Sequence, residues 1–244
     1  FYILFNTHRR IYIKNFFHRK HGYNEFILHY ANLVKNHVDA FVIGSELIGL
    51  TKVRNGNKFP AVDELVNLAS MVKEIMGKNV IITYAADWSE YHHTEGGWFN
   101  LDPLWASPNI DVVGIDAYFP VSDSQTPSVE ECLEGWMEHK TVINEVSKQF
   151  NKPVLFTEFG YRSVDFSGKE PWKSDRYKDP ANFNAQNNTT KALFETFWEE
   201  DWFAGGFIWK WFHNHEKSGG ENDNQFTPQN KPVEAIIKDY YSRY

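Results

Sequence analysis

Two glutamates each follow a run of apolar residues that is typical of a buried strand. Glu46 ends the run in "FVIGSEL", and Glu158 ends the run in "LFTEFG". Hydrolysis of a glycosidic bond requires two facing carboxyl groups, because one protonates the leaving oxygen while the other attacks the anomeric carbon. A separation of about 5–5.5 Å gives retention of configuration, and about 6.5–9.5 Å gives inversion. The alternative for either glutamate alone is a solvated residue where a strand meets a loop.

Other polar and aromatic residues also stand at or just beyond the ends of predicted strands. Barrels of parallel strands gather their sites on this face from several strands, whereas an open sheet concentrates its site at one switch point. No glycine-rich phosphate-binding pattern is present. The pattern therefore favours a barrel over an open nucleotide-binding sheet. Besides the two glutamates, the residues concerned are Ser45, Tyr84, Asp87, Trp88, Asp116, Tyr118, Trp209 and Trp211.

The strands that carry these residues alternate with helical patterns along the chain. Continuous apolar strands between amphipathic helices predict a parallel sheet covered by helices. We expect strands at 38–45, 79–86, 110–118, 153–158 and 205–211, and helices at 23–36, 60–77, 128–150, 188–200 and 232–244. With no linker or repeat, residues 1–244 are expected to form one domain. The predicted fold class is α/β, a (β/α)8 TIM barrel.

The predicted barrel is short of strands at its N-terminal side. A closed barrel of eight strands typically takes about 250 residues, yet only 37 residues precede the first predicted strand. Either "FYILF" (1–5) or "RIYIKNF" (10–16) is a candidate for one further strand. We therefore expect five to six strand–helix units and a barrel that is incomplete at its N-terminus. The chain starts at Phe1, which leads us to expect a processed chain or a fragment.

Composition excludes several classes of function. The net charge is −7 and basic residues are scattered, so no nucleic-acid partner is expected. The single Cys132 excludes an internal disulfide and a thiolate metal cluster. The sequence contains no run of 18 apolar residues, so no membrane-spanning helix is predicted. Aromatic residues make up 17% of the chain, which fits either a large aromatic core or a cleft lined with rings, as in carbohydrate sites.

Two histidine clusters raise the possibility of a metal site. They are "YHHTEGG", with His92, His93 and Glu95, and "HNHE", with His213, His215 and Glu216. Neither has two histidines at the helical spacing typical of zinc sites, and glycoside hydrolysis needs no metal. We predict neither a metal nor another cofactor.

Several ordered segments resemble glycoside hydrolase family 113. They are "HYANLVKNHVDAFVIGSELIGLT", "ITYAADWSEYHH", "WFNLDPLWASPNIDVVGIDAYFP", "KPVLFTEFGYRSVD" and "GGFIWKWF". Their middle part also resembles the TIM-barrel-like domain of phage-tail and gene-transfer-agent proteins. The resemblance runs from about Tyr23 to the C-terminus. It implies a clan A (β/α)8 fold and a retaining enzyme of the β-mannanase type.

The resemblance also implies roles for individual residues. Glu46 matches the acid/base at the end of the fourth family strand, and Glu158 matches the nucleophile at the end of the seventh. Ser45 occupies the place where clan A enzymes usually have asparagine, next to the sugar at subsite −1.

Position suggests further contacts, each with a structural alternative. Tyr118 is expected to hydrogen-bond Glu158, and Trp209 to form a stacking floor under the sugar, although both also suit the barrel core. Trp88 and Trp98 are candidates to line the cleft, and Tyr84 and Asp116 to contact substrate. Arg162 is a candidate partner for a carboxylate near the mouth, or part of a surface salt bridge.

Three hypotheses follow. The first is a retaining glycoside hydrolase acting on a β-linked polysaccharide or oligosaccharide, with β-1,4-mannan as the first candidate. The second is a noncatalytic glycan-binding or phage-tail-type barrel. The third is a small-molecule enzyme on a parallel sheet, which the absence of a phosphate-binding loop disfavours. The sequence fixes neither the sugar nor the oligomeric state. We expect a protein of bacterial origin that is periplasmic, displayed at the surface or secreted.

Overall fold

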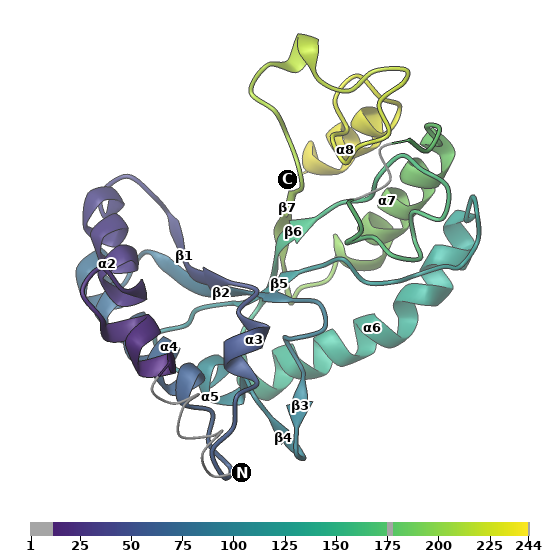
Figure 1. Cartoon of the computed structure of the whole chain (residues 1–244). Helices are drawn as coiled ribbons and strands as arrows, with labels where there is room; N and C mark the ends of the chain where they lie inside the picture. The colour runs from purple at the N-terminus through teal and green to yellow at the C-terminus, as the bar shows by residue number, and fades with distance from the viewer. Residues whose placement is uncertain (1–11, 175–177, 244) are drawn as a thin grey trace. The chain divides into compact units, whose positions relative to one another are not determined.

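The computed structural model describes residues 12–174 and 178–243 (Figure 1). Within these ranges, five strands form a sheet in the order β1-β2-β5-β6-β7, which is also their order along the chain. β1 is parallel to β2, and β6 is parallel to β7. The bounds are Ala40–Ser45 for β1, Ile81–Asp87 for β2, Val113–Asp116 for β5, Val154–Phe159 for β6 and Phe203–Ile208 for β7.

Helices lie between the strands along the chain, as parallel strands require, because each crossover must return the chain to the same end of the sheet. The longer helices are α2 (Tyr23–Val34), α4 (Pro60–Met76), α6 (Val129–Phe150), α7 (Phe183–Phe197) and α8 (Val233–Tyr241). The short elements are α3 (Ile48–Thr51), α5 (Asp102–Trp105), the 3-10 turn η1 (His215–Lys217) and an antiparallel hairpin of β3 (Thr94–Glu95) with β4 (Trp98–Phe99).

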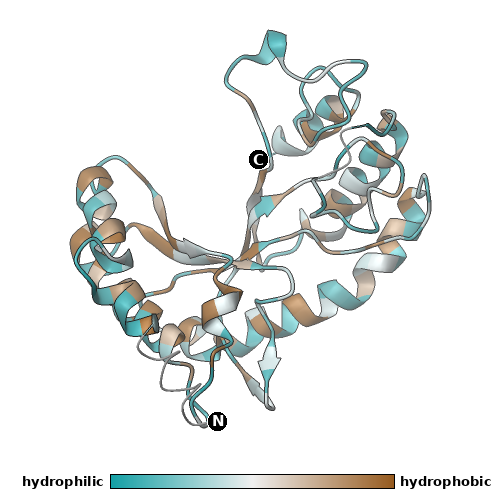
Figure 2. Ribbon diagram, in the orientation of Figure 1, coloured by the Kyte–Doolittle hydropathy of each residue, from teal (hydrophilic) through white to brown (hydrophobic). Residues whose placement is uncertain are grey.

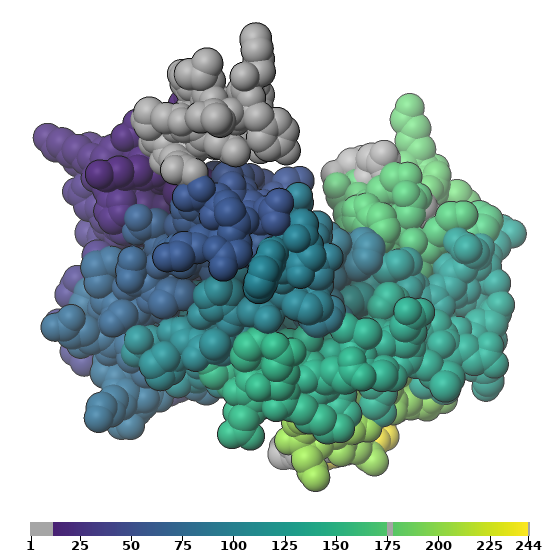
Figure 3. All heavy atoms as spheres, turned by 90° about the horizontal axis from the view of Figure 1, so that it is seen from below, coloured from purple at the N-terminus to yellow at the C-terminus, as the bar shows by residue number. Residues whose placement is uncertain are grey.

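The chain divides into two compact units. The first comprises Phe1–Ile115 and Phe150–Pro153, and its core forms where α4 packs on β1 and β2. Buried residues of α4 recur at positions 65, 68, 69 and 72, the spacing that places them on one face of a helix. Figure 2 colours long stretches of β1 and β2 as hydrophobic. In the space-filling view, this unit presents a closely packed surface coloured from purple to blue (Figure 3).

The second unit comprises Asp116–Gln149 and Val154–Tyr244. Its core is aromatic. The Phe156 ring on β6 lies 4.9 Å from Phe197 on α7, and Phe197 lies 5.0 Å from Trp136 on α6, both with edge-to-face geometry. Such contacts add about 0.5–1.5 kcal/mol per pair beyond the burial of area. The high aromatic content therefore builds a core in this unit, while Trp98, Trp172, Trp209 and Trp211 remain exposed.

Several helices begin or end at the residues that local sequence signals predicted. Pro60 starts α4, and Gly77 ends it with φ +87°. At the start of α6, the Glu131 amide donates to Ser128 Oγ, and the Ser128 amide donates to the Glu131 carboxylate. This reciprocal capping satisfies two amides that lack partners within the helix. Cys132, one turn into α6, is buried, and burial raises the pKa of its thiol to about 12.

Other expectations need correction. The described part of "RIYIKNF" belongs to a helical stretch over residues 12–18, not to a strand, and "FYILF" lies outside the described residues. α7 begins at Phe183 rather than at 188, because the Asn182 side chain accepts from the Ala185 amide and caps the helix there. β7 ends at Ile208, so Trp209 and Trp211 follow the strand. The expectation of a single domain stays a prediction.

Candidate active site

Glu46 directly follows β1 in the first unit and is exposed. Its backbone lies in the left-handed region, with φ +51°, which costs a residue with a side chain about 1–2 kcal/mol. Two amide groups hold this turn. The Glu46 amide donates to the Ala85 carbonyl over 2.9 Å, and the Leu47 amide donates to the Tyr84 hydroxyl over 2.7 Å. The end of β2 therefore sets the backbone conformation that carries the Glu46 side chain.

The close approach of β2 to β1 depends on Gly44. A Cβ atom at this position would lie 2.7 Å from the Tyr23 hydroxyl, so that hydroxyl would have to shift, and 3.2 Å from the Tyr84 ring, a tight contact. The Tyr23 hydroxyl instead donates to the Ile43 carbonyl over 2.9 Å. Because residue 44 has no side chain, Tyr84 reaches the turn at Glu46.

Tyr84 itself is fully buried. Its hydroxyl donates to the Glu90 carboxyl, at 3.0 Å from Oε1 and 3.1 Å from Oε2. Burial, followed by the charge of Glu90, raises the pKa of Tyr84 far above its ordinary value, so the phenol stays protonated and remains a donor. This burial does not support the substrate contact expected for Tyr84. Its surroundings fit a role in positioning neighbouring residues.

The remaining predicted residues of the first unit lie around the same strand ends. Ser45 is the exposed last residue of β1, Trp88 is half-buried in the turn after β2, and Trp98 is exposed on β4. In the histidine cluster, the His92 ring stacks on Phe99 with centroids 4.1 Å apart. His93 Nε2 lies 3.6 Å from Glu95 Oε2. Among the described residues, no group of three or more potential ligands is arranged to hold a metal ion.

Glu158 lies within β6 in the second unit and is half-buried. The Tyr118 hydroxyl donates to Glu158 Oε2 over 2.8 Å, so the hydrogen bond expected from the sequence is present. One residue before Glu158, the Thr157 hydroxyl donates to Oδ1 of the buried Asp116 over 2.7 Å. The backbone is also tied, because the Ala117 amide donates to the Glu158 carbonyl over 2.7 Å. Asp116 thus has a structural role on this edge of β6.

Trp209 follows β7 and stands beside the same strand. Its amide donates to the Phe159 carbonyl over 2.7 Å, and its side chain is 41% exposed, as a stacking platform requires. Gly160 makes room for it, because a Cβ atom there would lie 2.2 Å from the Trp209 carbonyl oxygen. Trp209 is therefore placed by the backbone that immediately follows Glu158.

Arg162 lies deeper than expected for a residue of a surface salt bridge. It is buried, and its Nε and Nη2 atoms donate to the backbone and side-chain oxygens of Asn224, over 3.2 and 3.3 Å. Nearby, the buried Lys231 ammonium lies 2.6 Å from Asp223 Oδ1. These contacts tie the loop before α8 to the segment after β6. In the second histidine cluster, His215 Nε2 lies 3.5 Å from Glu234 Oε1.

Reasoning from the sequence missed the buried network in the first unit. Glu90 is fully buried, and it accepts hydrogen bonds from the hydroxyls of Thr51 and Tyr84. Asn100 Nδ2 in turn donates to Thr51 Oγ1 over 3.2 Å. Nothing in the polar segment "DWSEYHH" distinguishes Glu90 from a solvated loop residue. The only local signal is the turn that Asp87 forms by accepting from the Ser89 amide over 2.8 Å.

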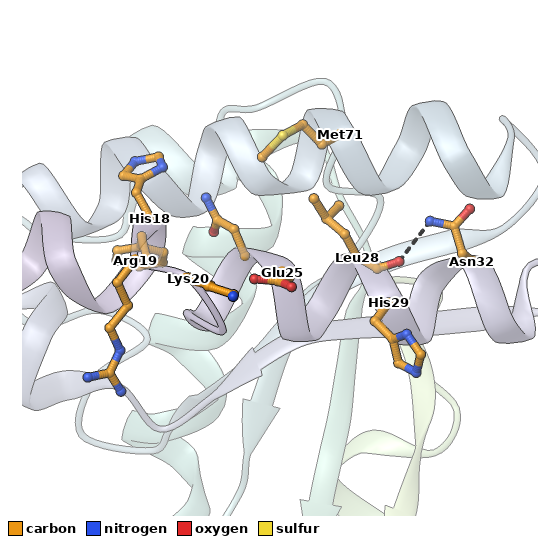
Figure 4. A pocket seen from close by; sticks show the side chains of 10 residues that line it. His18, Arg19, Lys20, Glu25, Leu28, His29, Asn32 and Met71 are labelled. Atoms are coloured by element: carbon orange, nitrogen blue, oxygen red, sulfur yellow. Dashed lines mark hydrogen bonds between the residues drawn. The ribbon is translucent and has the colours of Figure 1, made fainter.

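Two cavities lie away from the strand-end glutamates. One, of about 600 Å³, opens in the first unit between residues 17–20, α2 and α4 (Figure 4). Its rim carries His18, Arg19, Lys20, Glu25 and His29. The other, of about 570 Å³, lies in the second unit between β7 and α8 and has a mostly apolar lining that includes Trp211. Neither cavity contains Glu46 or Glu158.

No helix among the described residues is long and apolar enough to cross a membrane. Among curated proteins, no sequence matches the chain significantly.

Solved structures of glycoside hydrolases share the fold. The GH113 β-mannanase from Alicyclobacillus acidocaldarius in complex with ManMIm is 21% identical, with a TM-score of 0.69 over 91% of this chain and 61% of that one. A GH113 β-1,4-mannanase complex gives 22% identity and a TM-score of 0.68, with 91% and 62% covered. A Ruminococcus gnavus β-glucuronidase is 15% identical, with a TM-score of 0.58 over 91% of this chain and 36% of that one.

The similarity to family 113 seen in the sequence is thus confirmed at the level of the fold. This chain spans about three fifths of the length of the mannanases, and its five-stranded sheet with flanking helices forms part of a TIM barrel. A family model described as the GTA TIM-barrel-like domain matches residues 21–236. Because this match covers most of the sequence, the chain belongs to the GTA TIM-barrel-like domain family.

Proposed function

We propose that the protein is a retaining glycoside hydrolase that cleaves a β-1,4-linked polysaccharide or oligosaccharide, with β-mannan as the first candidate. In this proposal Glu158 is the nucleophile and Glu46 is the acid/base. The observation that carries the proposal is the Tyr118 hydroxyl at 2.8 Å from Glu158 Oε2. A donor on one oxygen stabilises the carboxylate and fixes its plane, so that the other oxygen has a defined direction of attack.

The reaction has two displacements. In the first, a Glu158 oxygen attacks the anomeric carbon, and the bond to the leaving oxygen breaks as Glu46 transfers its proton to that oxygen. A glycosyl ester on Glu158 results. In the second, Glu46 accepts a proton from water as the water oxygen attacks the same carbon and releases Glu158. Two inversions give net retention, and both side chains return to their starting states.

Further residues are proposed to bind the sugar. The exposed Trp209 ring offers an apolar face for the CH groups of a sugar at subsite −1. Ser45 and Trp88 are proposed to contact substrate from the first unit, where both lie at strand ends. Asp116 is proposed to act indirectly on the site, because it accepts a hydrogen bond from the hydroxyl of Thr157, the residue before Glu158.

The test combines turnover with stereochemistry. The purified protein is incubated with β-mannan and manno-oligosaccharides, and the anomer released first is read by proton NMR. The proposal expects the β-anomer, and expects that Glu158→Gln lowers turnover by roughly 10³-fold or more. The matched control Glu74→Gln removes an exposed carboxylate on α4 and is expected to keep full activity. An α-anomer as first product, or an active Glu158→Gln variant, would refute the mechanism.

The family match favours a second candidate, a noncatalytic glycan-binding domain of the phage-tail type. Such a domain keeps the partial barrel and an aromatic platform without turnover. Titration of manno-oligosaccharides, followed by the fluorescence of the exposed tryptophans, separates the two candidates. Saturable binding without release of reducing sugar supports the second, and product release supports the first.

A further inference from the structure

Glu90 is a fully buried acidic residue whose role the proposed reaction leaves open. It lies in the loop after β2, and its own amide donates to the Asp87 carbonyl over 2.7 Å. Burial raises the pKa of its carboxyl to about 7, although hydrogen bonds from Thr51 and Tyr84 act in the opposite direction. A buried acid with a fixed set of donors is costly to place, so its contacts indicate a specific task.

A chain of hydrogen bonds connects Glu90 to the turn at Glu46. The Leu47 amide donates to the Tyr84 hydroxyl over 2.7 Å. Because the hydroxyl oxygen accepts this bond, its proton is directed elsewhere, and it goes to the Glu90 carboxyl over 3.0 Å. The Leu47 amide can only donate, so the direction of the first bond is fixed, and in the second bond the Tyr84 hydroxyl is the donor to Glu90.

The peptide bond between Glu46 and Leu47 is the element that this chain holds. The peptide unit is planar, so fixing the Leu47 amide also fixes ψ of Glu46. On the other side, the Glu46 amide is held by the Ala85 carbonyl over 2.9 Å, and φ of Glu46 is +51°. A conformation of this kind persists only where its surroundings enforce it. Both restraints come from consecutive residues of β2.

We propose that Glu90 is a positioning residue for Glu46, because it holds the Tyr84 hydroxyl that holds the Leu47 amide. This inference rests on the acid/base role proposed for Glu46. Glu90 keeps at least one acceptor oxygen for Tyr84 in either protonation state. The second arm of the network consists of the side chains of Thr51 and Asn100. The Thr51 backbone amide donates to the Leu47 carbonyl over 2.9 Å, and Thr51→Val keeps that bond while it removes the side-chain arm, so it supplies a matched control.

The first experiment measures the backbone restraint without any substrate. Hydrogen exchange of the Leu47 amide is followed by NMR in the wild type and four variants. In Tyr84→Phe and Glu90→Leu, we expect exchange about fivefold or more faster, because a hydrogen bond to the amide is lost or loosened. Glu90→Gln keeps an acceptor oxygen and is expected to stay within about twofold of the wild type. Thr51→Val removes only the side-chain hydrogen bonds of Thr51 to Glu90 and Asn100 and is also expected to leave the exchange rate within about twofold of the wild type.

The second experiment measures the consequence for acid catalysis. A misplaced proton donor slows the departure of a poor leaving group much more than that of a good one, because only the poor one needs protonation. With phenyl and 2,4-dinitrophenyl β-mannobiosides, we expect Tyr84→Phe and Glu90→Leu to lose about tenfold or more in kcat/KM, which reports the first displacement, on the phenyl substrate and about twofold on the other. Glu90→Gln and Thr51→Val are expected to keep the wild-type ratio.

The outcomes separate this inference from the proposed function. If the wild type hydrolyses no substrate while Leu47 exchange follows the expected pattern, the proposed function fails and the link from Glu90 to residue 46 stands. If the wild type is active but Leu47 exchange is unchanged in Tyr84→Phe and Glu90→Leu, the positioning role is wrong. Equal losses on both substrates in these variants would also reject it, because a general loss of structure does not depend on the leaving group.

Discussion

The two strand-end glutamates are held in different ways. Glu158 lies inside strand β6, where the register with β7 shifts between Phe156 and Phe159, and Tyr118 contacts its carboxylate directly. Glu46 lies just beyond β1 in a left-handed turn, and its backbone is held through Leu47, Tyr84 and Glu90. In the proposed reaction, the nucleophile must keep one oxygen aimed at one carbon, and the hydrogen bond from Tyr118 suits Glu158 to that task. The proposed acid/base must serve two steps, and the backbone of Glu46 is held while its side chain is exposed.

The contacts around the two glutamates also differ. Around Glu158, close backbone packing dominates, with Gly160 against the Trp209 carbonyl. Around Glu46, a buried polar network dominates, with Glu90 at its centre. Added volume at Gly160 therefore tests the packing beside Glu158, and changes in hydrogen bonding and pH test the network that holds the turn at Glu46.

The largest expected effect comes from removing each carboxylate in turn. Both Glu158→Ala and Glu46→Ala are expected to lose roughly 10³-fold or more in turnover of an unactivated substrate. With a dinitrophenyl glycoside and added azide, the two variants should differ in product. Azide replaces the nucleophile in Glu158→Ala and gives the α-glycosyl azide. In Glu46→Ala it attacks the glycosyl ester instead and gives the β-glycosyl azide. NMR of the product distinguishes the two, and the same azide from both variants contradicts the assigned roles.

The next largest effect is expected in how the free energy of unfolding depends on pH. Burial raises the pKa of Glu90 from 4.5 to about 7, so the folded chain retains a proton that the unfolded chain releases between these values. The stabilisation is fully present below about pH 4.5 and is lost as pH rises through about 7. Relative to Glu90→Gln, the wild type should lose up to about 3 kcal/mol of unfolding free energy over this window. Urea unfolding at several pH values measures the difference, and parallel curves for the two proteins contradict it.

Added volume tests the packing of the second unit. In Gly160→Ala, the new Cβ atom meets the Trp209 carbonyl oxygen at 2.2 Å, so we expect a loss of about 1–3 kcal/mol in stability. The matched control is Gly49→Ala, whose Cβ atom meets nothing within 4 Å and which lies in α3, where alanine is favourable. Thermal unfolding compares the two variants. Equal melting temperatures would show that the contact at Gly160 relaxes freely.

The smallest effect is expected from the direct contact to Glu158. Tyr118→Phe removes the hydroxyl at 2.8 Å from Oε2 and leaves the ring that packs against Phe226. A loss of about tenfold in kcat is expected, equivalent to one charge-assisted hydrogen bond. Steady-state kinetics on a mannobioside measures it. An unchanged kcat would show that β6 alone orients the carboxylate.

The sequence was informative where position along a strand determines the environment. The positions of Glu46 and Glu158 at strand ends and the hydrogen bond from Tyr118 to Glu158 were predicted from apolar runs that end in polar residues, and the catalytic roles stay predictions. Tyr84 was assigned to substrate by the same rule, but its side chain points into the interior. The rule locates a residue along the strand and does not give its direction once strands are buried on both faces.

Tertiary contacts explain what the sequence concealed. Glu90 lies in a polar loop whose sequence indicates a solvated segment, and it is buried against Thr51, 39 positions away in the chain, and against Tyr84 on the preceding strand. The left-handed turn at Glu46 occurs at a residue type that seldom adopts it, so no local pattern announced it. The early start of α7 was missed because the signal for it is the side-chain cap at Asn182.

The proposed mechanism requires Glu158 to form a covalent bond to the sugar. The protein is incubated with 2-deoxy-2-fluoro-β-mannosyl fluoride, whose fluorine at C2 slows both steps while the fluoride leaving group keeps the first one feasible. Mass spectrometry of the intact protein and its peptides then locates the label. The account predicts one added fluoromannosyl group, on the peptide that contains Glu158. A label on Glu46, or none on a protein that hydrolyses mannan, would contradict it.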